Sequence, residues 1–267
     1  MKVGNIELKK EKLFMIMGPC VIETEDITLK IAEFLKEISD EMSIDLIFKA
    51  SFDKANRSSI SSPRGPGINE GLRILEKVKS EFGIPVTTDI HEAWQAKIVS
   101  EIIDIIQIPA FLCRQTDLLI AAGETGLPVN VKKSQYMAPE DMEHVAEKIR
   151  STDNDNILFT ERGTFFGYRN LVVDIRNIPK MKKSGYMVII DATHSVQRPT
   201  AIDGVTGGDP EFIPIIAGSG VLAGANGVFL EVHPNPPNAY SDGANSLELK
   251  KINSLLIWLK KIYNITQ

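Results

Sequence analysis

The chain has 267 residues, 43% of them hydrophobic and 24% charged, with 19 glycines and 14 prolines, and these ordinary globular proportions exclude a fibrous or disordered protein. Its net charge of −5 has the wrong sign for a protein that coats nucleic acid or an anionic membrane. Two cysteines, Cys20 and Cys113, lie far apart without a CxxC motif, which excludes a disulfide scaffold and a zinc ribbon. Residues 1–17 contain no signal peptide or membrane span, so we expect a soluble cytoplasmic protein without nucleic-acid or membrane partners.

Short apolar runs rich in Ile, Val and Phe alternate along the chain with amphipathic segments. Residues 2–8 come first, and their weak alternation around Gly4 and Asn5 indicates a β-hairpin that closes the bottom of a barrel. Eight runs follow that we predict to be strands: 13–17, 46–48, 86–88, 103–106, 129–131, 157–159, 187–190 and 228–230. Apolar residues three and four apart predict helices between them, most clearly at 27–38, 71–82 and 142–150.

The regular alternation of strand and helix predicts the fold. It indicates parallel strands, and nearly continuous apolar strands are typical of a sheet that is buried on both faces. Eight such units predict an α/β fold of the (β/α)8 TIM-barrel type, which takes about 250 residues. No stretch has the composition of a linker, so we expect residues 1–267 to form a single barrel domain. A doubly wound open sheet is the alternative with the same local pattern.

Every predicted strand is followed by polar side chains. The eight loops that follow the strands of a barrel share one face, and catalytic residues gather there. One charged residue after a strand is usually a solvated loop residue or a helix cap, but eight together favour a functional site. They include Cys20, Lys49, Asp89, Gln107, Lys132, Arg162, His194 and Glu231.

Cations are concentrated at these strand ends although the chain is acidic. Guanidinium groups match phosphate bidentately and lysine adds point charge, so two phosphates, or a phosphate and a carboxylate, are the expected counter-ions. The alternative is that some of them are separate surface residues, which is plausible for Lys54, Arg64 and Lys133. The set comprises Lys49, Lys54, Arg57, Arg64, Arg114, Lys132, Lys133 and Arg162.

Four further residues are candidate metal ligands. A thiolate, an imidazole and carboxylates together suit Zn2+ or Fe2+ better than Mg2+. Their spacing does not decide the question, because a lone cysteine after a strand is more often a small buried hydrophobe, which is our interpretation of Cys113. The candidates are Cys20, His194, Glu231 and Asp242.

The other histidines and one glycine-rich segment carry weaker signals. His91 either caps a helix or contacts substrate, and His144 is expected on the surface. His233 follows Glu231 by two positions, so both would face the same side of a strand, and His233 either orients Glu231 or contacts substrate. The segment 203–209 is expected to be a loop that covers the site.

The string KASFDKANRSS at residues 49–59 resembles the family of 3-deoxy-D-manno-octulosonate 8-phosphate synthases, also called 2-dehydro-3-deoxyphosphooctonate aldolases. Further strings extend the resemblance over the whole chain: GPC (18–20), TDIHE (88–92), QIPAFLCRQTD (107–117), NVKK (130–133), ERG (161–163), DATHSVQ (191–197) and EVHP (231–234). The resemblance implies an enzyme that condenses phosphoenolpyruvate with D-arabinose 5-phosphate and water, releases phosphate, and serves lipopolysaccharide biosynthesis.

The resemblance also implies roles for the matching residues. Phosphoenolpyruvate would be bound by Lys54, Gln107, Ala110, Phe111, Lys132 and Arg162. Arabinose 5-phosphate would be bound by Asn56, Arg57, Ser58 and Arg114, the last reaching it from a neighbouring subunit of a homotetramer. The reacting atoms would be surrounded by Lys49, Asp89, His194 and Glu231, with Asp89 or Glu231 as the proton carrier.

The same family has a metal-dependent and a metal-independent branch, and the latter has Asn where this chain has Cys20. Cys20 together with His194, Glu231 and Asp242 therefore implies the metal-dependent branch, with one divalent ion per subunit (Zn2+, Fe2+ or Mn2+). The segment 198–203 departs from the family pattern, so the resemblance does not predict how the covering loop after His194 moves.

Other functions fit the same residues less well. The related 3-deoxy-D-arabino-heptulosonate 7-phosphate synthase uses erythrose 4-phosphate, but residues 55–59 favour the five-carbon sugar. A Schiff-base aldolase would use Lys49 or Lys132 as its nucleophile. A barrel that binds anionic sugars as a sensor is the non-enzymatic alternative.

Overall fold

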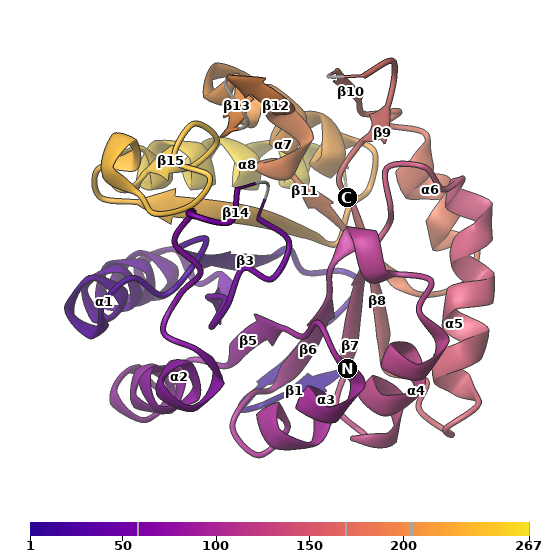
Figure 1. Ribbon diagram of the computed structural model, residues 1–267. Coiled ribbons are helices and arrows are strands. Elements are labelled where there is room, and N and C mark those ends of the chain that lie inside the picture. Colours follow the sequence, from indigo (N-terminus) through magenta and orange to yellow (C-terminus); the bar gives the residue numbers. More distant parts are fainter. Residues whose placement is uncertain (58, 169, 203–204, 267) are drawn as a thin grey trace.

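Eight parallel strands form a closed barrel in the computed structural model, which describes residues 1–57, 59–168, 170–202 and 205–266 (Figure 1). The sheet order is β11-β8-β7-β6-β5-β4-β3-β14, and pairing of β11 with β14 closes the ring. This closure confirms the TIM barrel and excludes the open doubly wound sheet. The barrel strands are β3 (Phe14–Gly18), β4 (Asp45–Lys49), β5 (Val86–Asp89), β6 (Ile105–Ile108), β7 (Val129–Lys132), β8 (Ile157–Glu161), β11 (Met187–Asp191) and β14 (Gly227–His233).

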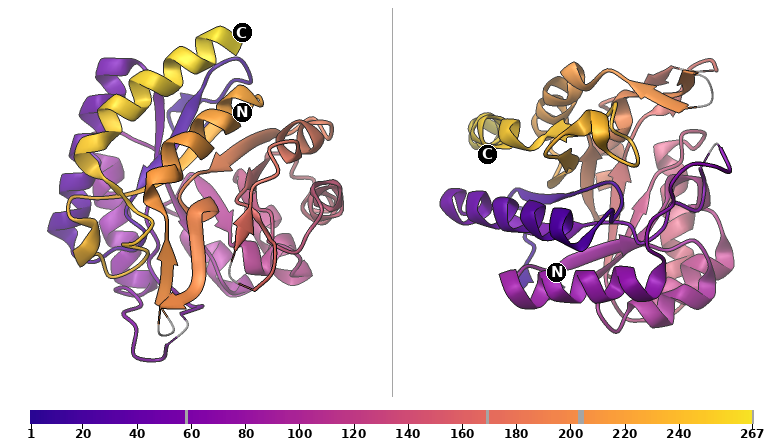
Figure 2. Two further views of the ribbon diagram at one scale, coloured as in Figure 1. Left: turned by 90° about the horizontal axis from the view of Figure 1, so that it is seen from above. Right: turned by 60° about the vertical axis from the view of Figure 1, so that its left-hand side comes forward.

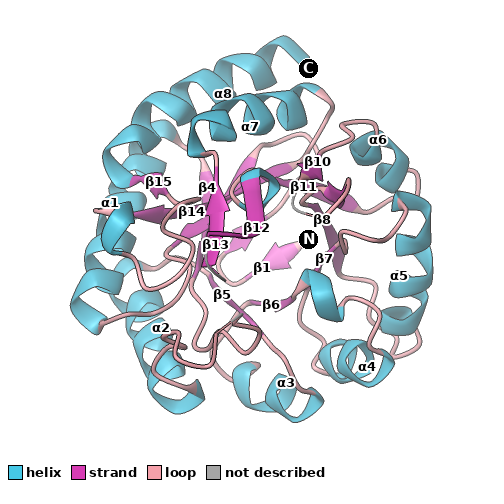
Figure 3. Ribbon diagram, turned by 45° about the horizontal axis from the view of Figure 1, so that its top comes forward, coloured by secondary structure: helices cyan, strands magenta, loops and turns pink. Residues whose placement is uncertain are grey.

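One helix follows each barrel strand, and the helices form an outer ring around the sheet (Figure 3). They are α1 (Glu25–Met42), α2 (Ile68–Phe82), α3 (Ala93–Val99), α4 (Thr116–Glu124), α5 (Met142–Arg150), α6 (Asn177–Lys182), α7 (Ile213–Leu222) and α8 (Ile252–Thr266). Helix α1 starts earlier than predicted because the Thr24 side chain caps it by accepting the amide of Ile27. Among the described residues, no helix has the length and apolar character needed to cross a bilayer.

The strands extend beyond the predicted apolar runs at their carboxyl ends. Lys49, Asp89, Lys132 and Asp191 are the last residues of their strands and are buried. The apolar pattern stops before them, but their backbones still pair with neighbouring strands. The prediction for β6 was wrong by two residues, because the Asp104 carboxylate accepts the Val86 amide and occupies the turn before the strand.

A β-hairpin closes the amino-terminal end of the barrel, as predicted. Strands β1 (Lys2–Val3) and β2 (Ile6–Glu7) pair antiparallel, and Gly4 turns between them with a φ of 52°. Val3 and Leu8 pack against side chains from the barrel interior: Phe14, Ile16, Ile47, Ile105, Leu158, Met187, Ile189 and Phe229. The inner core therefore fills this end of the barrel, and the opposite end is left for polar groups.

The segment after His194 is not the irregular loop that we expected. It forms an antiparallel hairpin of β12 (Gln197–Ile202) and β13 (Val205–Gly208), whose residues 203–204 lie outside the described residues. Figure 2 shows β12, β13 and the segments 50–57 and 59–66 extending from the same end of the barrel, away from both termini. The remaining short elements are β9 (Thr164–Phe165), β10 (Leu171–Val172), β15 (Leu247–Glu248), and the 3-10 turns η1 (Ala110–Leu112), η2 (Pro139–Asp141), η3 (His194–Val196), η4 (Pro210–Phe212), η5 (Pro236–Asn238) and η6 (Leu249–Lys251).

Candidate active site

A cavity of about 290 Å³ lies where the carboxyl ends of the barrel strands converge. Arg114 is exposed and does not line it, and Ser58 lies outside the described residues. The residues predicted from the sequence that line it are Lys49, Lys54, Asn56, Arg57, Asp89, Gln107, Ala110, Phe111, Lys132, Arg162, His194 and Asp242. The fold thus brings strand ends from most of the barrel to one place.

Lys49 and Glu231 form a buried ion pair at the base of this site. The Lys49 Nζ donates to Glu231 Oε1 at 3.1 Å and to the Cys20 carbonyl at 3.1 Å. The Lys54 Nζ lies 4.0 Å from the same Glu231 oxygen. Burial alone would raise the pKa of Glu231, but the charges of His194, Lys49 and Lys54 outweigh it and lower that pKa to about 2. Glu231 is therefore ionised at neutral pH.

A second buried pair joins β7 to β11. Lys132 Nζ donates to Asp191 Oδ2 at 2.6 Å and lies 3.6 Å from the centroid of the Phe229 ring. The same Asp191 oxygen lies 2.7 Å from His194 Nδ1, and Asp191 Oδ1 accepts the His194 amide at 2.9 Å. Burial lowers the pKa of Lys132, and the nearby Asp191 charge partly opposes this shift. Asp191 thus orients both a cation and a candidate metal ligand.

All four candidate metal ligands converge beside these pairs. Ligand atoms of Cys20, Glu231 and Asp242 lie within 4.8 Å of one another. His194 Nε2 lies 3.5 Å from Glu231 Oε1 and 4.0 Å from Asp242 Oδ2. The Cys20 thiol donates to Asp242 Oδ2 at 3.1 Å, consistent with a pKa that burial and then the Glu231 charge raise well above its ordinary value. Residues that are distant in the sequence therefore bring sulfur and oxygen donors together, and the nitrogen donor of His194 lies beside the two carboxylates of this group.

Asp89, the last residue of β5, also lines the cavity. It accepts a hydrogen bond from the Ser51 hydroxyl, and its Oδ2 lies 3.1 Å from His91 Nε2. Burial would raise the pKa of Asp89, but Lys54 and the His91 hydrogen bond hold it well below its usual range. His91 lines the cavity and is not a cap, because Glu92 and Gln95 form the capping box of α3. Of the two roles left open for His91, the structure supports the one at the cavity.

Amide side chains that the sequence did not single out also line the cavity. Gln197 accepts from Arg162 Nη2 at 2.6 Å and donates to Asp242 Oδ1 at 2.9 Å, so it connects a cation to a candidate ligand. Gln135, like the predicted Gln107, has a buried carbonyl oxygen without a hydrogen-bond partner among the described residues. Such atoms are expected where a ligand completes the bonding. Gln197 belongs to the family-like string at 191–197, which is the one sequence signal that could have marked it as a site residue. Gln135 lies in none of these strings, so no sequence signal indicated its place at the cavity.

Three of the cations, Lys54, Arg64 and Lys133, had the alternative interpretation of separate surface residues. The structure supports that interpretation only for Arg64. Arg64 has an exposed side chain that pairs with Asp53. Lys54 has a side chain that is only 11% exposed and lies at the cavity. Lys133 is fully buried: its Nζ donates to two backbone carbonyls and to Thr164, and lies 3.6 Å from Glu161 Oε1. The surface interpretation of Lys54 and Lys133 is therefore wrong.

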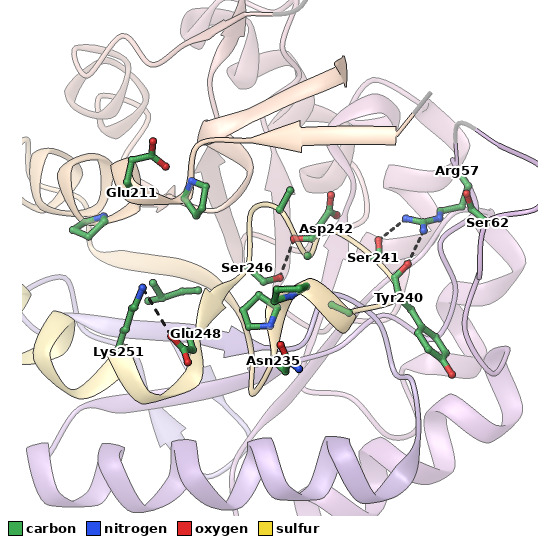
Figure 4. Close-up of a pocket in the computed structure, with 18 residues that line it drawn as sticks. Arg57, Ser62, Glu211, Asn235, Tyr240, Ser241, Asp242, Ser246, Glu248 and Lys251 are labelled. Atoms are coloured by element: carbon green, nitrogen blue, oxygen red, sulfur yellow. Dashed lines mark hydrogen bonds and ion pairs between the residues drawn. The ribbon is translucent and has the colours of Figure 1, made fainter. Parts of the chain in front are cut away.

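A larger hollow of about 1110 Å³ adjoins the cavity (Figure 4). The two share Arg57, Ser241 and Asp242. Arg57 crosses between them and donates to Ser241 Oγ at 2.6 Å and to the Tyr240 carbonyl at 2.7 Å. Prolines line much of the larger hollow, and Lys49, Lys132 and Arg162 are absent from its lining. Although this hollow is the larger of the two, we place the active site in the smaller cavity, because most of the predicted cations and carboxylates line that cavity.

Comparison with known proteins agrees with this site. Residues 4–267 match the model of the DAHP synthetase I family. The chain belongs to this family. It is 54% identical over 264 residues to the 2-dehydro-3-deoxyphosphooctonate aldolase of Koribacter versatilis, covering 98% of this chain and 95% of the relative. It is 52% identical over 256 residues to the protein of that name from Fusobacterium nucleatum, covering 96% and 92%. The resemblance found in the sequence strings is confirmed.

Proposed function

We propose that this member of the family is a 2-dehydro-3-deoxyphosphooctonate aldolase. It condenses phosphoenolpyruvate with D-arabinose 5-phosphate and water to 3-deoxy-D-manno-octulosonate 8-phosphate, and it releases phosphate. The observation that carries the proposal is the ring of buried cations at the strand ends, combined with the common name of relatives at 52–54% identity. The erythrose 4-phosphate alternative is not favoured, because these relatives bear the octulosonate name.

The cation arrangement suits phosphoenolpyruvate, which carries a phosphate and a carboxylate. We assign its binding to Lys54, Gln107, the Ala110–Phe111 backbone, Lys132 and Arg162. Arg162 Nη1 and Gln107 Oε1 are buried and have no hydrogen-bond partner among the described residues, as expected of groups that meet a ligand. Cationic side chains that hold both anionic substrates offset their mutual repulsion and supply orientation.

Arabinose 5-phosphate would occupy the outer part of the cavity. We assign its binding to Asn56, Arg57, Ser58 and Arg114. Asn56 and Arg57 line the cavity from the segment that follows β4. Arg114 is exposed and lines neither the cavity nor the adjoining hollow among the described residues, so it would complete the site of a neighbouring subunit in a homotetramer. The half-exposed Phe111, near it in the sequence, is consistent with a covered surface there.

One divalent ion per subunit fits the remaining residues. Cys20, His194, Glu231 and Asp242 would hold Zn2+, Fe2+ or Mn2+, and the mixture of sulfur, nitrogen and oxygen donors suits these ions. Glu231 Oε2 is fully buried without a hydrogen-bond partner among the described residues, which supports a ligand role. When bound, the ion would supply Lewis-acid chemistry. Because the Cys20 pKa is raised, loading must displace the thiol proton, so affinity should rise with pH.

The reaction joins C3 of the enol phosphate to the aldehyde carbon, while water adds at C2 and the phosphate leaves. The water loses one proton as it adds at C2 and its second proton as the C2–O bond to phosphate breaks and the ketone forms. The aldehyde oxygen takes up one of these protons, and the other leaves with the phosphate. Neighbouring cations keep Asp89 and Glu231 ionised, so each is able to accept a proton. Lys49 holds Glu231 in place, and Asp191 holds Lys132 and His194. We propose that the whole chain acts as one cytoplasmic barrel domain that supplies a lipopolysaccharide precursor.

Phosphate release with each sugar tests the function. Phosphoenolpyruvate with arabinose 5-phosphate should release phosphate, and erythrose 4-phosphate should not replace the five-carbon sugar. Preference for erythrose 4-phosphate would contradict the substrate assignment. Release with neither sugar would leave the sensor interpretation in place of the enzyme.

A Schiff-base aldolase predicts a different result. Borohydride added with the substrates would then trap a covalent adduct on Lys49 or Lys132. Both amines instead donate hydrogen bonds to carboxylates, Glu231 and Asp191, and each would have to leave its carboxylate to attack a carbonyl carbon. We therefore expect no adduct by mass spectrometry, with Lys49→Met and Lys132→Met as reference proteins.

A further inference from the structure

Glu23 is a buried carboxylate that neither the substrate site nor the ligand set uses. It lies in the loop between β3 and α1, three residues after Cys20, and its side chain is only 5% exposed. Its Oε1 accepts the Tyr240 amide at 2.8 Å and lies 3.4 Å from His233 Nε2. A carboxylate withdrawn from water is stable only when such partners replace its hydration. Both partners belong to segments that carry candidate metal ligands.

The first partner connects Glu23 to the strand of Glu231. His233 is the last residue of β14, and because side chains alternate along a strand, it faces the same side as Glu231. The Asn235 amide donates to His233 Nδ1 at 3.0 Å, which leaves Nε2 to carry the ring proton of a neutral imidazole. His233 Nε2 is buried and forms no hydrogen bond among the described residues, so its contact with Glu23 at 3.4 Å is one of proximity and charge. The carboxylate of Glu23 thus lies against the end of the strand that presents Glu231.

The second partner connects Glu23 to the loop of Asp242. Asp242 has a φ of 51°, a left-handed conformation that is strained for a non-glycine residue and persists only where its surroundings hold it. Tyr240, two residues earlier, is held on both sides: its amide donates to Glu23 and its carbonyl accepts from Arg57. Figure 4 shows Tyr240, Ser241 and Asp242 along this loop, with the Arg57 side chain reaching Tyr240 and Ser241.

We propose that Glu23 is a positioning residue for the cation site. It ties the loop that carries Asp242 to the strand end that carries Glu231, from the segment that carries Cys20, and so sets the distance between the ligands and the affinity for the ion. This inference rests on the proposed metal site. Outer groups that orient metal ligands typically contribute about 10- to 100-fold in metal affinity.

Three substitutions of Glu23 test this positioning role. Glu23→Ala removes the contacts with the Tyr240 amide and the His233 ring. Glu23→Asp keeps the charge but shortens the side chain by one methylene, so the carboxylate lies further from both groups and the fold is disturbed less than by alanine. Both should weaken Zn2+ binding by about 10-fold or more in a chelator-competition titration. Glu23→Gln keeps an acceptor for the Tyr240 amide and should retain most of the affinity. With Co2+, the thiolate charge-transfer absorption of Cys20 should become weaker or shift in the Ala and Asp variants, and should match that of the parent in the Gln variant.

Glu25→Ala is the matched control. Glu25 lies two residues along the chain and pairs with Arg73 and Lys77 on α2, away from the ligands. It should change thermal stability without changing Zn2+ affinity or the Co2+ spectrum. Parental Zn2+ affinity in both Glu23→Ala and Glu23→Asp would overturn the inference. If the parent itself fails to bind one Zn2+ per chain, and Cys20→Ala makes no difference, the proposed metal site is wrong instead.

Discussion

The fully buried pair of Lys133 and Glu161 links the strand of Lys132 to the strand of Arg162. Glu161 accepts the amides of Arg162 and Gly163 and the side chain of Asn177, at 2.7–3.0 Å. At the 3.6 Å separation of Lys133 Nζ and Glu161 Oε1, an effective dielectric constant of about 20 gives an attraction of about 4.6 kcal/mol. Removing one partner leaves a buried charge uncompensated, which destabilises a fold by about 3–5 kcal/mol.

We therefore expect Lys133→Met and Glu161→Gln each to destabilise the fold by about 3 kcal/mol, at the lower end of that range. Each remaining ion keeps three hydrogen bonds from or to neutral groups. The double variant should be more stable than the sum of the single effects predicts, by about 2 kcal/mol. The melting temperature of each single variant should fall by about 6–12 °C, at about 2–4 °C per kcal/mol for a chain of this size.

The double-mutant cycle compares the unfolding free energies of the parent, the two single variants and the double variant. They are measured by calorimetry on the metal-free proteins at one protein concentration, and urea midpoints serve as a second measure. The exposed pair Lys180 and Glu140, 3.0 Å apart, is the control, and its coupling should stay below about 1 kcal/mol. Strict additivity in the buried cycle, or equal coupling in both cycles, would refute the electrostatic account. Because the pair supports the backbones beside Lys132 and Arg162, the single variants should also raise the Kd for phosphoenolpyruvate.

Three further predictions test separate parts of the site. Cys20→Ala should abolish stoichiometric Zn2+ binding measured by metal analysis after dialysis, and chelator-resistant activity in the parent would contradict the metal assignment. Asp89 has a pKa held below the value of about 3.9 in unfolded chains, so its contribution to stability is complete above about pH 4 and is lost as the pH falls further. Asp89→Asn should accordingly lose less stability than the parent between about pH 5 and pH 3 in urea titrations, and parallel losses would disprove this. Gly18→Ala would place a Cβ 2.0 Å from the Lys49 carbonyl oxygen, so we expect a loss of about 3 kcal/mol or more by thermal melting, and a parental melting temperature would show that β3 and β4 can separate.

The sequence alone determined the strand and helix alternation and the polar strand ends. The apolar runs are local signals, since a strand buried on both faces has to be apolar along its length. Positions such as Lys49, Asp89 and Lys132 are therefore predictable as site residues from their places directly after such runs. The family-like strings added a sugar-binding role for Arg57 that spacing could not supply.

Only the tertiary structure decided which groups meet. Closure of the barrel depends on pairing of β11 with β14, and the sequence pattern is the same for an open sheet. Lys133 follows Lys132 in the chain, yet one faces the cavity and the other is enclosed beside Glu161. Glu23 and Tyr240 touch across 217 positions of sequence. Such contacts depend on how whole elements pack, and no local pattern encodes them, because hydrophobic periodicity specifies which face is buried but not what it is buried against.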